Sequence, residues 1–142
     1  MKTIELNFEG CWISKDVLPD YKGIYCVYRA TPNKNPDGST TVTLHELIYI
    51  GKAEDETINQ RHDNHEKQPL FEAELREGEE LRYSTVKVSS EDIDRVENGL
   101  IFKRKPRLND DLTDHFHHPD THFVLKGVIR DIATDFTVEQ TE

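Results

Sequence analysis

The sequence predicts an α+β (α/β) fold: one domain in which a small, mainly antiparallel β-sheet is flanked by helices. Three observations indicate this class. Short runs rich in bulky and β-branched residues alternate with clusters of turn residues, as in strands joined by hairpins. Three segments have the composition of helices, and one of them repeats apolar residues at helical spacing. A chain of 142 residues is long enough to bury one hydrophobic core.

The first half of the chain predicts three strands. Residues 2–12 begin with apolar and polar residues in alternation, which is typical of a strand. Residues 23–29 form a second bulky run, and turn-forming residues fill positions 31–38. The chain then returns through residues 41–44 and 47–50. Two strands around one turn make a long hairpin, so we expect these strands to lie side by side.

A polar helix is expected next, over residues 57–67, where Gly and Pro are absent. Arg61 and His65 are four residues apart and would share one face of that helix. A short second helix over residues 70–76 would end near Gly78, because glycine is favoured just after a helix.

The second half predicts two more strands and a longer helix. Residues 81–88 and 122–129 have strand composition. Residues 89–92 indicate a helix start with a serine N-cap and acidic residues in the first turn, and the helix would run from 90 to 105. The polar tail after the last strand is expected to be frayed.

Composition narrows the functional classes. The formal net charge is −10, which opposes non-specific binding to nucleic acid, so any DNA contact requires a local basic patch. An isolated monomer should therefore bind random duplex weakly, and a homodimer or a protein partner would supply further contacts. No apolar run approaches 18 residues and the N-terminus lacks a signal-peptide core, so we expect a cytoplasmic protein that does not enter membranes.

Glu97 stands out within the longer predicted helix. The apolar residues Ile93, Val96, Leu100 and Ile101 form a stripe that should face the core, and Glu97 falls inside it. A carboxylate there is costly unless it reaches water, pairs with an arginine or binds a metal. One carboxylate suffices for Mg²⁺, which keeps most of its waters and also binds phosphate oxygens.

Two tripeptides, Gly23-Ile24-Tyr25 and Tyr49-Ile50-Gly51, carry a resemblance to a known family. In their order and content they resemble the motifs of the GIY-YIG nucleases, in particular single-domain, restriction-endonuclease-like members. The resemblance covers about residues 21–110, with residues 1–20 and 111–142 as terminal extensions. The downstream residues that match the family pattern are Lys52, Arg61, His65, Glu97 and Asn109.

The resemblance implies a GIY-YIG nuclease fold and an endonuclease that hydrolyses phosphodiester bonds in double-stranded DNA with Mg²⁺ or Mn²⁺ as cofactor. It implies that Tyr25 is the general base, that Tyr49 and His65 orient water or phosphate, and that Asn109 braces the surroundings of Glu97. The alternative is a non-catalytic module of the same fold that binds nucleic acid or a protein partner.

The chemistry of phosphodiester hydrolysis supports further roles. Glu97 would hold the metal ion, and the guanidinium of Arg61 would bind the phosphate through two donors. Tyr25 would become a base if a nearby cation such as Lys52 lowered its pKa from about 10. Each of these residues also has a plainer interpretation as a strand aromatic, a solvated helix face or a turn residue.

Two other clusters have alternative interpretations. Lys103, Arg104, Lys105 and Arg107 are the dense basic run, which either complements a helix C-terminus or grips phosphates beside the scissile one. His115, His117, His118 and His122 are rich enough in imidazole for zinc, but they lack cysteine partners. We expect these histidines to decorate a solvent-facing loop.

Overall fold

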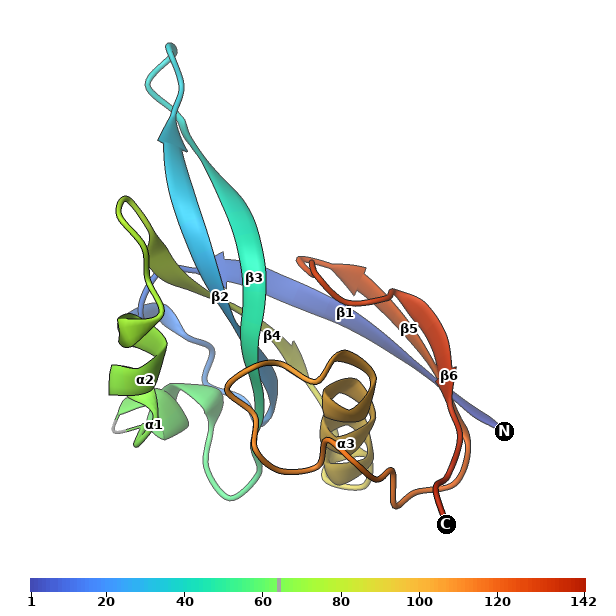
Figure 1. The fold of residues 1–142 in the computed structure, drawn as a ribbon. Coiled ribbons are helices and arrows are strands. Elements are labelled where there is room, and N and C mark those ends of the chain that lie inside the picture. The colour runs from blue at the N-terminus through green and yellow to red at the C-terminus, as the bar shows by residue number, and fades with distance from the viewer. Residues whose placement is uncertain (64) are drawn as a thin grey trace.

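The computed structural model describes residues 1–63 and 65–142 (Figure 1). Its elements follow one another along the chain as β1 (Lys2–Trp12), a 3₁₀ turn η1 (Lys15–Val17), β2 (Gly23–Lys34), β3 (Thr40–Ala53), α1 (Ile58–Asp63), α2 (Gln68–Ala73), β4 (Glu80–Lys87), α3 (Ile93–Arg104), β5 (Thr121–Gly127) and β6 (Asp135–Val138). The strands predicted at residues 2–12 and around Tyr25 and Tyr49 are therefore present.

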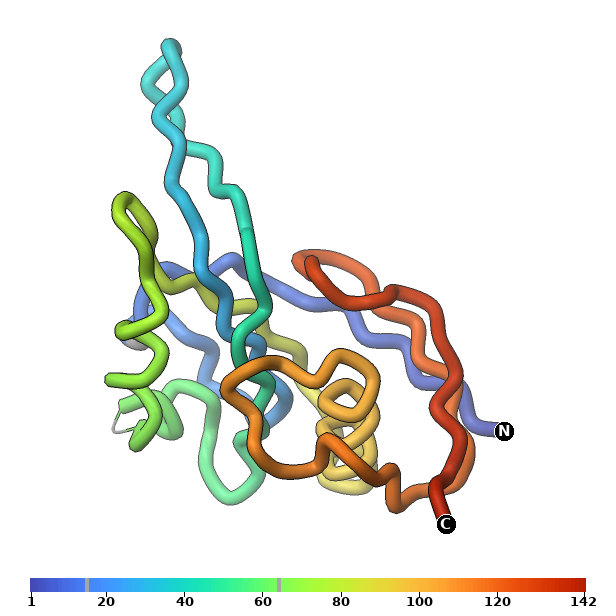
Figure 2. Tube along the Cα trace, in the orientation of Figure 1, coloured from blue at the N-terminus to red at the C-terminus, as the bar shows by residue number. Residues whose placement is uncertain are grey.

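The strands form one six-stranded sheet in the order β3-β2-β4-β1-β5-β6. Only β1 and β5 pair in parallel; the other neighbours are antiparallel. The predicted fold class was wrong, because this curled sheet dominates the molecule as a half-barrel rather than forming a small sheet flanked by helices (Figures 1 and 2). The structure is a mixed α+β fold, and α1 and α2 contain only six residues each.

The physical reason for this difference lies in the terminal segments. We expected residues 1–20 and 111–142 to be terminal extensions of extra strands and loops outside the core of the fold, but they supply β1, β5 and β6 to the one sheet. β1 pairs with β4 at one end and with β5 along most of its length, so it joins the two halves of the sheet. Irregular registers within the β2–β3 and β1–β4 pairs add twist to the sheet, as β-bulges do.

Side chains of β2 point alternately to two packing layers. Ile24, Cys26 and Tyr28 belong to the larger core, together with the apolar stripe of α3. Tyr25 and Val27 belong to a second cluster, which includes side chains of α1 and α2. The predicted stripe of α3 is confirmed, because Ile93, Val96, Leu100 and Ile101 are all buried.

The helix predicted over residues 57–67 is present as α1, but its predicted extent was wrong. α1 ends at Asp63 and α2 begins at Gln68, so His65 does not share a helix face with Arg61; Asn64 lies outside the described residues. The backbone N–H of Lys67 donates to Nδ1 of His65 instead of continuing a helix. Pro69 lies in the first turn of α2, where its missing N–H costs nothing.

Other boundaries also differ from prediction. The expected serine N-cap of α3 was wrong: Asp92 is the cap residue, it makes no side-chain capping bond, and Ser89 contributes its carbonyl oxygen to two N–H groups. The expected frayed tail was wrong as well, because β6 pairs with β5 and buries Phe136 and Val138. Strand pairing decided the structure of the tail, and local composition did not indicate it.

None of the helices in the described part of the chain has the length and apolar character needed to cross a bilayer.

Candidate active site

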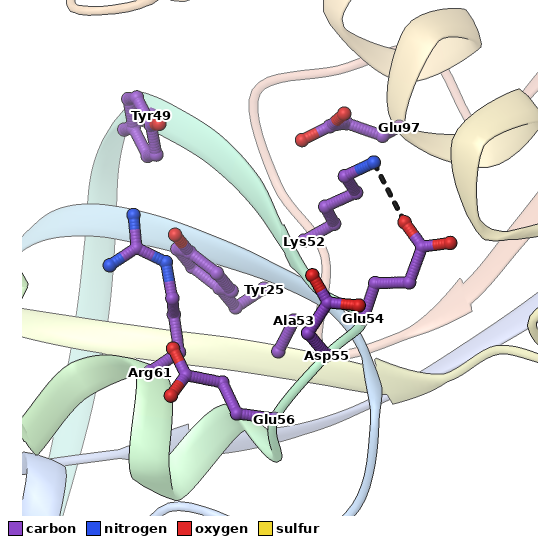
Figure 3. Close-up of a pocket in the computed structure, with 9 residues that line it drawn as sticks. All are labelled: Tyr25, Tyr49, Lys52, Ala53, Glu54, Asp55, Glu56, Arg61 and Glu97. Atoms are coloured by element: carbon purple, nitrogen blue, oxygen red, sulfur yellow. Dashed lines mark hydrogen bonds and ion pairs between the residues drawn. The ribbon is translucent and has the colours of Figure 1, made fainter.

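A cavity of about 330 Å³ opens beside the edge strand β3 (Figure 3). Five of the predicted site residues line it, although they come from β2, β3, α1 and α3. These residues are Tyr25, Tyr49, Lys52, Arg61 and Glu97. Residues 53–56, in the segment that joins β3 to α1, complete the wall and add three carboxylates. The cavity therefore combines two cations, two phenols and several acids.

The two glycines of the tripeptides have a steric role in building this cavity. A Cβ at Gly51 would lie 2.4 Å from both Cζ and Oη of Tyr25, because the tyrosine ring crosses the strand at that point. A Cβ at Gly23 would lie 2.0 Å from the carbonyl oxygen of Val86 on the neighbouring strand. Both glycines thus allow a close approach that no other residue permits.

We expect Gly51→Ala to destabilise the protein by about 1–3 kcal/mol, the usual cost of overpacking a core, because the buried ring of Tyr25 must move. Thermal or denaturant unfolding measures the loss. In a Tyr25→Ala background, where the ring is absent, the same glycine substitution should cost far less. Equal costs in the two backgrounds would show that Tyr25 is not the group that excludes a side chain at position 51.

Tyr25 is buried and hydrogen-bonded to His65. The distance from its Oη to Nε2 of His65 is 2.7 Å. Nδ1 of His65 accepts the backbone N–H of Lys67 at 3.0 Å, so in the neutral ring the proton resides on Nε2. His65 therefore donates to Tyr25, and the hydroxyl proton of Tyr25 is left free for another acceptor. Burial lowers the pKa of His65 to about 4, which keeps the ring neutral.

Both tyrosines are held in the protonated state at neutral pH. Burial raises the pKa of Tyr25 far above 10, and the charge of Arg61 only partly opposes this. Burial also raises the pKa of Tyr49 to about 12. The hypothesis that Lys52 lowers the pKa of Tyr25 is wrong for the protein without bound ligands. The ammonium of Lys52 donates to the carboxylates of Glu54 and Asp94 instead.

Arg61 projects from α1 and forms a two-pronged ion pair with Glu66. Its Nη1 and Nη2 donate to the two carboxylate oxygens at 3.0 and 2.9 Å. Hydrogen bonds from Arg61 lower the pKa of Glu66 to about 2. Glu66 is largely exposed, so an incoming phosphate could replace its carboxylate in the same geometry.

Lys52 joins the acidic side of the cavity. Its Nζ donates to Glu54 at 2.8 Å (Figure 3), and it also donates to Asp94 on the first turn of α3. Glu97, one turn further along α3, faces the same cavity and is partly buried. Burial raises its pKa to about 7, Lys52 opposes the shift, and Asp94, Asp111 and Glu54 increase it. The positive charge around Glu97 is thus too small to keep the pKa of its carboxyl group at the ordinary value of 4.5.

This raised pKa predicts how Glu97→Gln changes stability with pH. The unfolded chain loses the Glu97 proton near pH 4.5 and the folded protein near pH 7, so ionised Glu97 weakens folding progressively between these values and fully above them. The cost is up to about 3 kcal/mol. We expect the glutamine variant to be more stable than the original protein well above pH 7 and to lose this advantage below pH 4.5. Thermal unfolding of both proteins across this range measures the difference, and an advantage independent of pH would contradict the assignment.

Asn109 holds strand β3 rather than Glu97. Its Oδ1 accepts the N–H of Ile50 at 2.9 Å and its Nδ2 donates to the carbonyl of the same residue at 2.8 Å. The amide thereby pairs with the free edge of β3 next to Tyr49. Asn98, which sequence reasoning missed, is buried on α3 and hydrogen-bonds Leu112, His115 and His117, so it fixes the loop that carries Asp111.

The dense basic run does not form one open patch. Lys103 lies over the ring of Phe136, and Arg104 binds Asp131. Lys105 donates to the carbonyl of Thr113. Arg107 pairs with Glu46 and Glu74, both at 2.6 Å. Each of the four basic side chains is therefore engaged by a different partner within the chain. Their role in binding nucleic acid stays a prediction.

Sequence reasoning also missed His62. Its ring is buried, stacks edge-on against Tyr25 with centroids 4.3 Å apart, and finds no hydrogen-bond partner for either nitrogen among the described residues. Burial lowers its pKa to about 3, so the ring is neutral. The sequence places a histidine next to Arg61, but that position does not predict the contact of His62 with Tyr25, which depends on packing.

Within the described residues, no group of three or more His, Cys, Asp or Glu side chains is arranged to hold a metal ion. The expectation that all four histidines of residues 115–122 lie in a loop was wrong for His122, which lies on β5 and bonds Asp135. His115 and His117 stack on each other in the loop before β5. Comparisons of the chain with protein-family models, with curated proteins and with solved structures gave no match.

Proposed function

We propose that the protein is a Mg²⁺-dependent endonuclease that hydrolyses phosphodiester bonds in DNA, as its sequence resemblance to GIY-YIG nucleases predicts. The observation that carries the proposal is the convergence of Tyr25, Tyr49, Lys52, Arg61 and Glu97 in one cavity. Side chains of these types together supply a phosphate clamp, a carboxylate for a cation and a hydroxyl that can exchange a proton.

The residues of the cavity fit a divalent cation. Glu97 is a partly buried carboxylate whose pKa is raised by burial and by neighbouring acids, so a bound cation would relieve an unfavourable charge. Mg²⁺ needs only one or two protein carboxylates, and Glu97 would be its ligand. Mg²⁺ or Mn²⁺ bound here supplies positive charge, which stabilises the developing charge on phosphate and favours the ionised form of nearby acids.

Arg61 would bind the scissile phosphate. Its guanidinium already makes a two-pronged contact with the carboxylate of Glu66, and a phosphate accepts the same pair of donors. Lys52 is held by Glu54 and Asp94, so its ammonium stays in the cavity and offsets part of the negative charge that would otherwise repel DNA.

Tyr25 would accept the proton of the attacking water in its phenolate form, after its own hydroxyl proton has passed to solvent. The donor Nε2–H of His65 stabilises the phenolate form, because it hydrogen-bonds the oxygen that becomes charged. The positive charge of Arg61 acts in the same direction. Tyr49, whose ring centroid lies 6.2 Å from that of Tyr25, would orient the water or the phosphate. Asn109 would keep β3, and with it Tyr49, in place.

The experiment that tests the proposal is incubation with linear, nicked and branched DNAs, in Mg²⁺ or in EDTA. We expect cleavage of at least one substrate in Mg²⁺ and none in EDTA. Equal cleavage in both conditions would reject the metal assignment. Cleavage of RNA alone would retain the chemistry and correct the substrate.

A further inference from the structure

The β2–β3 hairpin extends far beyond the sheet as a two-stranded arm, residues 31–43 (Figures 1 and 2). Twenty-three residues separate Tyr25 from Tyr49, and the cavity itself uses only the base of this hairpin. The side chains of the arm are mostly exposed and belong to neither core cluster. A protruding ribbon that contributes nothing to the core requires another explanation.

Charge separates this hairpin from the rest of the molecule. Within the arm, residues 31–43, Lys34 and Asp37 are the charged residues, so the net charge of the arm is zero and the rest of the chain carries −10. Asp37 is bonded to the N–H and hydroxyl of Ser39. At the base of the hairpin, Arg29 and Lys52 are each paired with carboxylates. The arm is thus a part of an acidic protein that a polyanion can approach with little repulsion.

Most side chains of the arm carry hydrogen-bonding groups, and Pro32, Pro36 and Val42 are its apolar residues. Asn33 bonds Thr43 across the arm at 2.9 Å, and Thr31 bonds His45, just beyond the arm, at 2.6 Å. The register irregularities of the hairpin place the extra residues on β3, so β2 keeps its alternation and Asn33 has the same parity as Tyr25. Amide and hydroxyl groups on a ribbon are the groups that contact base edges and phosphates, and the major groove admits a two-stranded β-ribbon.

The distances suit a duplex that lies along the edge of the sheet. β3 is the edge strand, and it carries Tyr49 and Lys52 at one end and the arm at the other. From Tyr25 to Asn33 a strand spans about 26 Å. This corresponds to roughly 8 base pairs at 3.4 Å each. A duplex whose phosphate occupied the cavity would therefore pass the arm within about one helical turn.

We propose that the arm binds a groove of duplex DNA about one helical turn from the phosphate held in the cavity. This inference rests on the proposed function for the position of the phosphate. The arm gives the otherwise acidic protein a grip on the duplex, with Lys34 as its basic group. The substrate is accordingly a duplex that continues beyond the cleavage site, rather than a single strand or a short end.

A shortened arm tests the inference. An Asn-Gly turn replaces residues 33–41 and joins Pro32 to Val42, which are partners in the register. We expect unchanged thermal stability, because the arm lies outside the core. Binding to a long duplex, measured without divalent cations, should weaken at least about tenfold. The hydroxyl-radical footprint should shrink at one end, while binding to duplexes of about 8 base pairs stays the same.

A single substitution gives a matched control. Lys34→Ala should lower the slope of log affinity against log salt by about 1, the loss of one phosphate contact. Lys87→Ala, which lies opposite Gly23 at the end of β2 far from the arm, should leave the slope unchanged. Equal binding by the original and shortened proteins at every duplex length would overturn the inference. Arm-dependent binding without any cleavage would uphold the arm and reject the proposed nuclease activity.

Discussion

Glu97→Gln should abolish cleavage while leaving the protein folded and able to bind DNA. The amide keeps the size of the side chain but removes the charge that would hold a cation. A metal ion contributes several kcal/mol to a transition state of this kind, so the rate should fall on the order of a thousandfold or more. Cleavage rates at saturating Mg²⁺ measure the loss. DNA binding should persist or tighten, because a negative charge that faces the phosphate is gone.

Glu91→Gln is the matched control for this variant. Glu91 is exposed just before α3, and its replacement changes the net charge by the same amount. Its cleavage rate should equal that of the original protein. If Glu97→Gln cut DNA as fast as Glu91→Gln, the metal assignment would be lost, and most of the proposed mechanism with it.

Tyr25→Phe should reduce cleavage about a hundredfold to ten-thousandfold, the range expected when a general base is removed. The ring remains, so the packing against His62 and Gly51 is kept. The lost hydroxyl leaves Nε2–H of His65 unpaired, which should cost about 1–3 kcal/mol of stability. Cleavage rates and unfolding free energies of the same preparation measure the two effects separately.

Tyr28→Phe provides the control, because Tyr28 is a second buried tyrosine on β2 whose hydroxyl is also hydrogen-bonded. Its Oη donates to the carbonyl of Arg130 at 3.1 Å and accepts the N–H of the same residue at 3.0 Å. It belongs to the other packing layer and does not line the cavity. We expect a comparable loss of stability with little loss of cleavage. Parallel losses in both variants would mean that Tyr25 acts through stability alone.

The sequence predicted the local parts of the site well, because they depend on neighbouring residues. Alternation and turn composition correctly paired the strand of Tyr25 with the strand of Tyr49, and the register places Tyr25 opposite Gly51. The position of Glu97 in an apolar stripe correctly indicated a partly buried carboxylate.

What the sequence did not reveal depends on contacts between distant residues. β1 and β5 pair although more than a hundred residues separate them, and no local pattern announces that pairing. The same pairing creates a partner for β6, which turns a polar tail into a strand. The contact of His65 with Tyr25 was not predicted from a helix face, because the chain leaves the helix before His65. The pairing of Arg61 with Glu66 likewise requires the loop geometry.

Cleavage of supercoiled plasmid shows whether the cavity around Tyr25 and Glu97 hydrolyses DNA with a divalent cation. The original protein and Glu97→Gln, purified in parallel, are incubated with the plasmid in Mg²⁺ and in EDTA, and nicked and linear products are quantified. We predict products only for the original protein in Mg²⁺. Binding of the plasmid by both proteins, with no product from either in Mg²⁺, would contradict this prediction and identify a non-catalytic binding module.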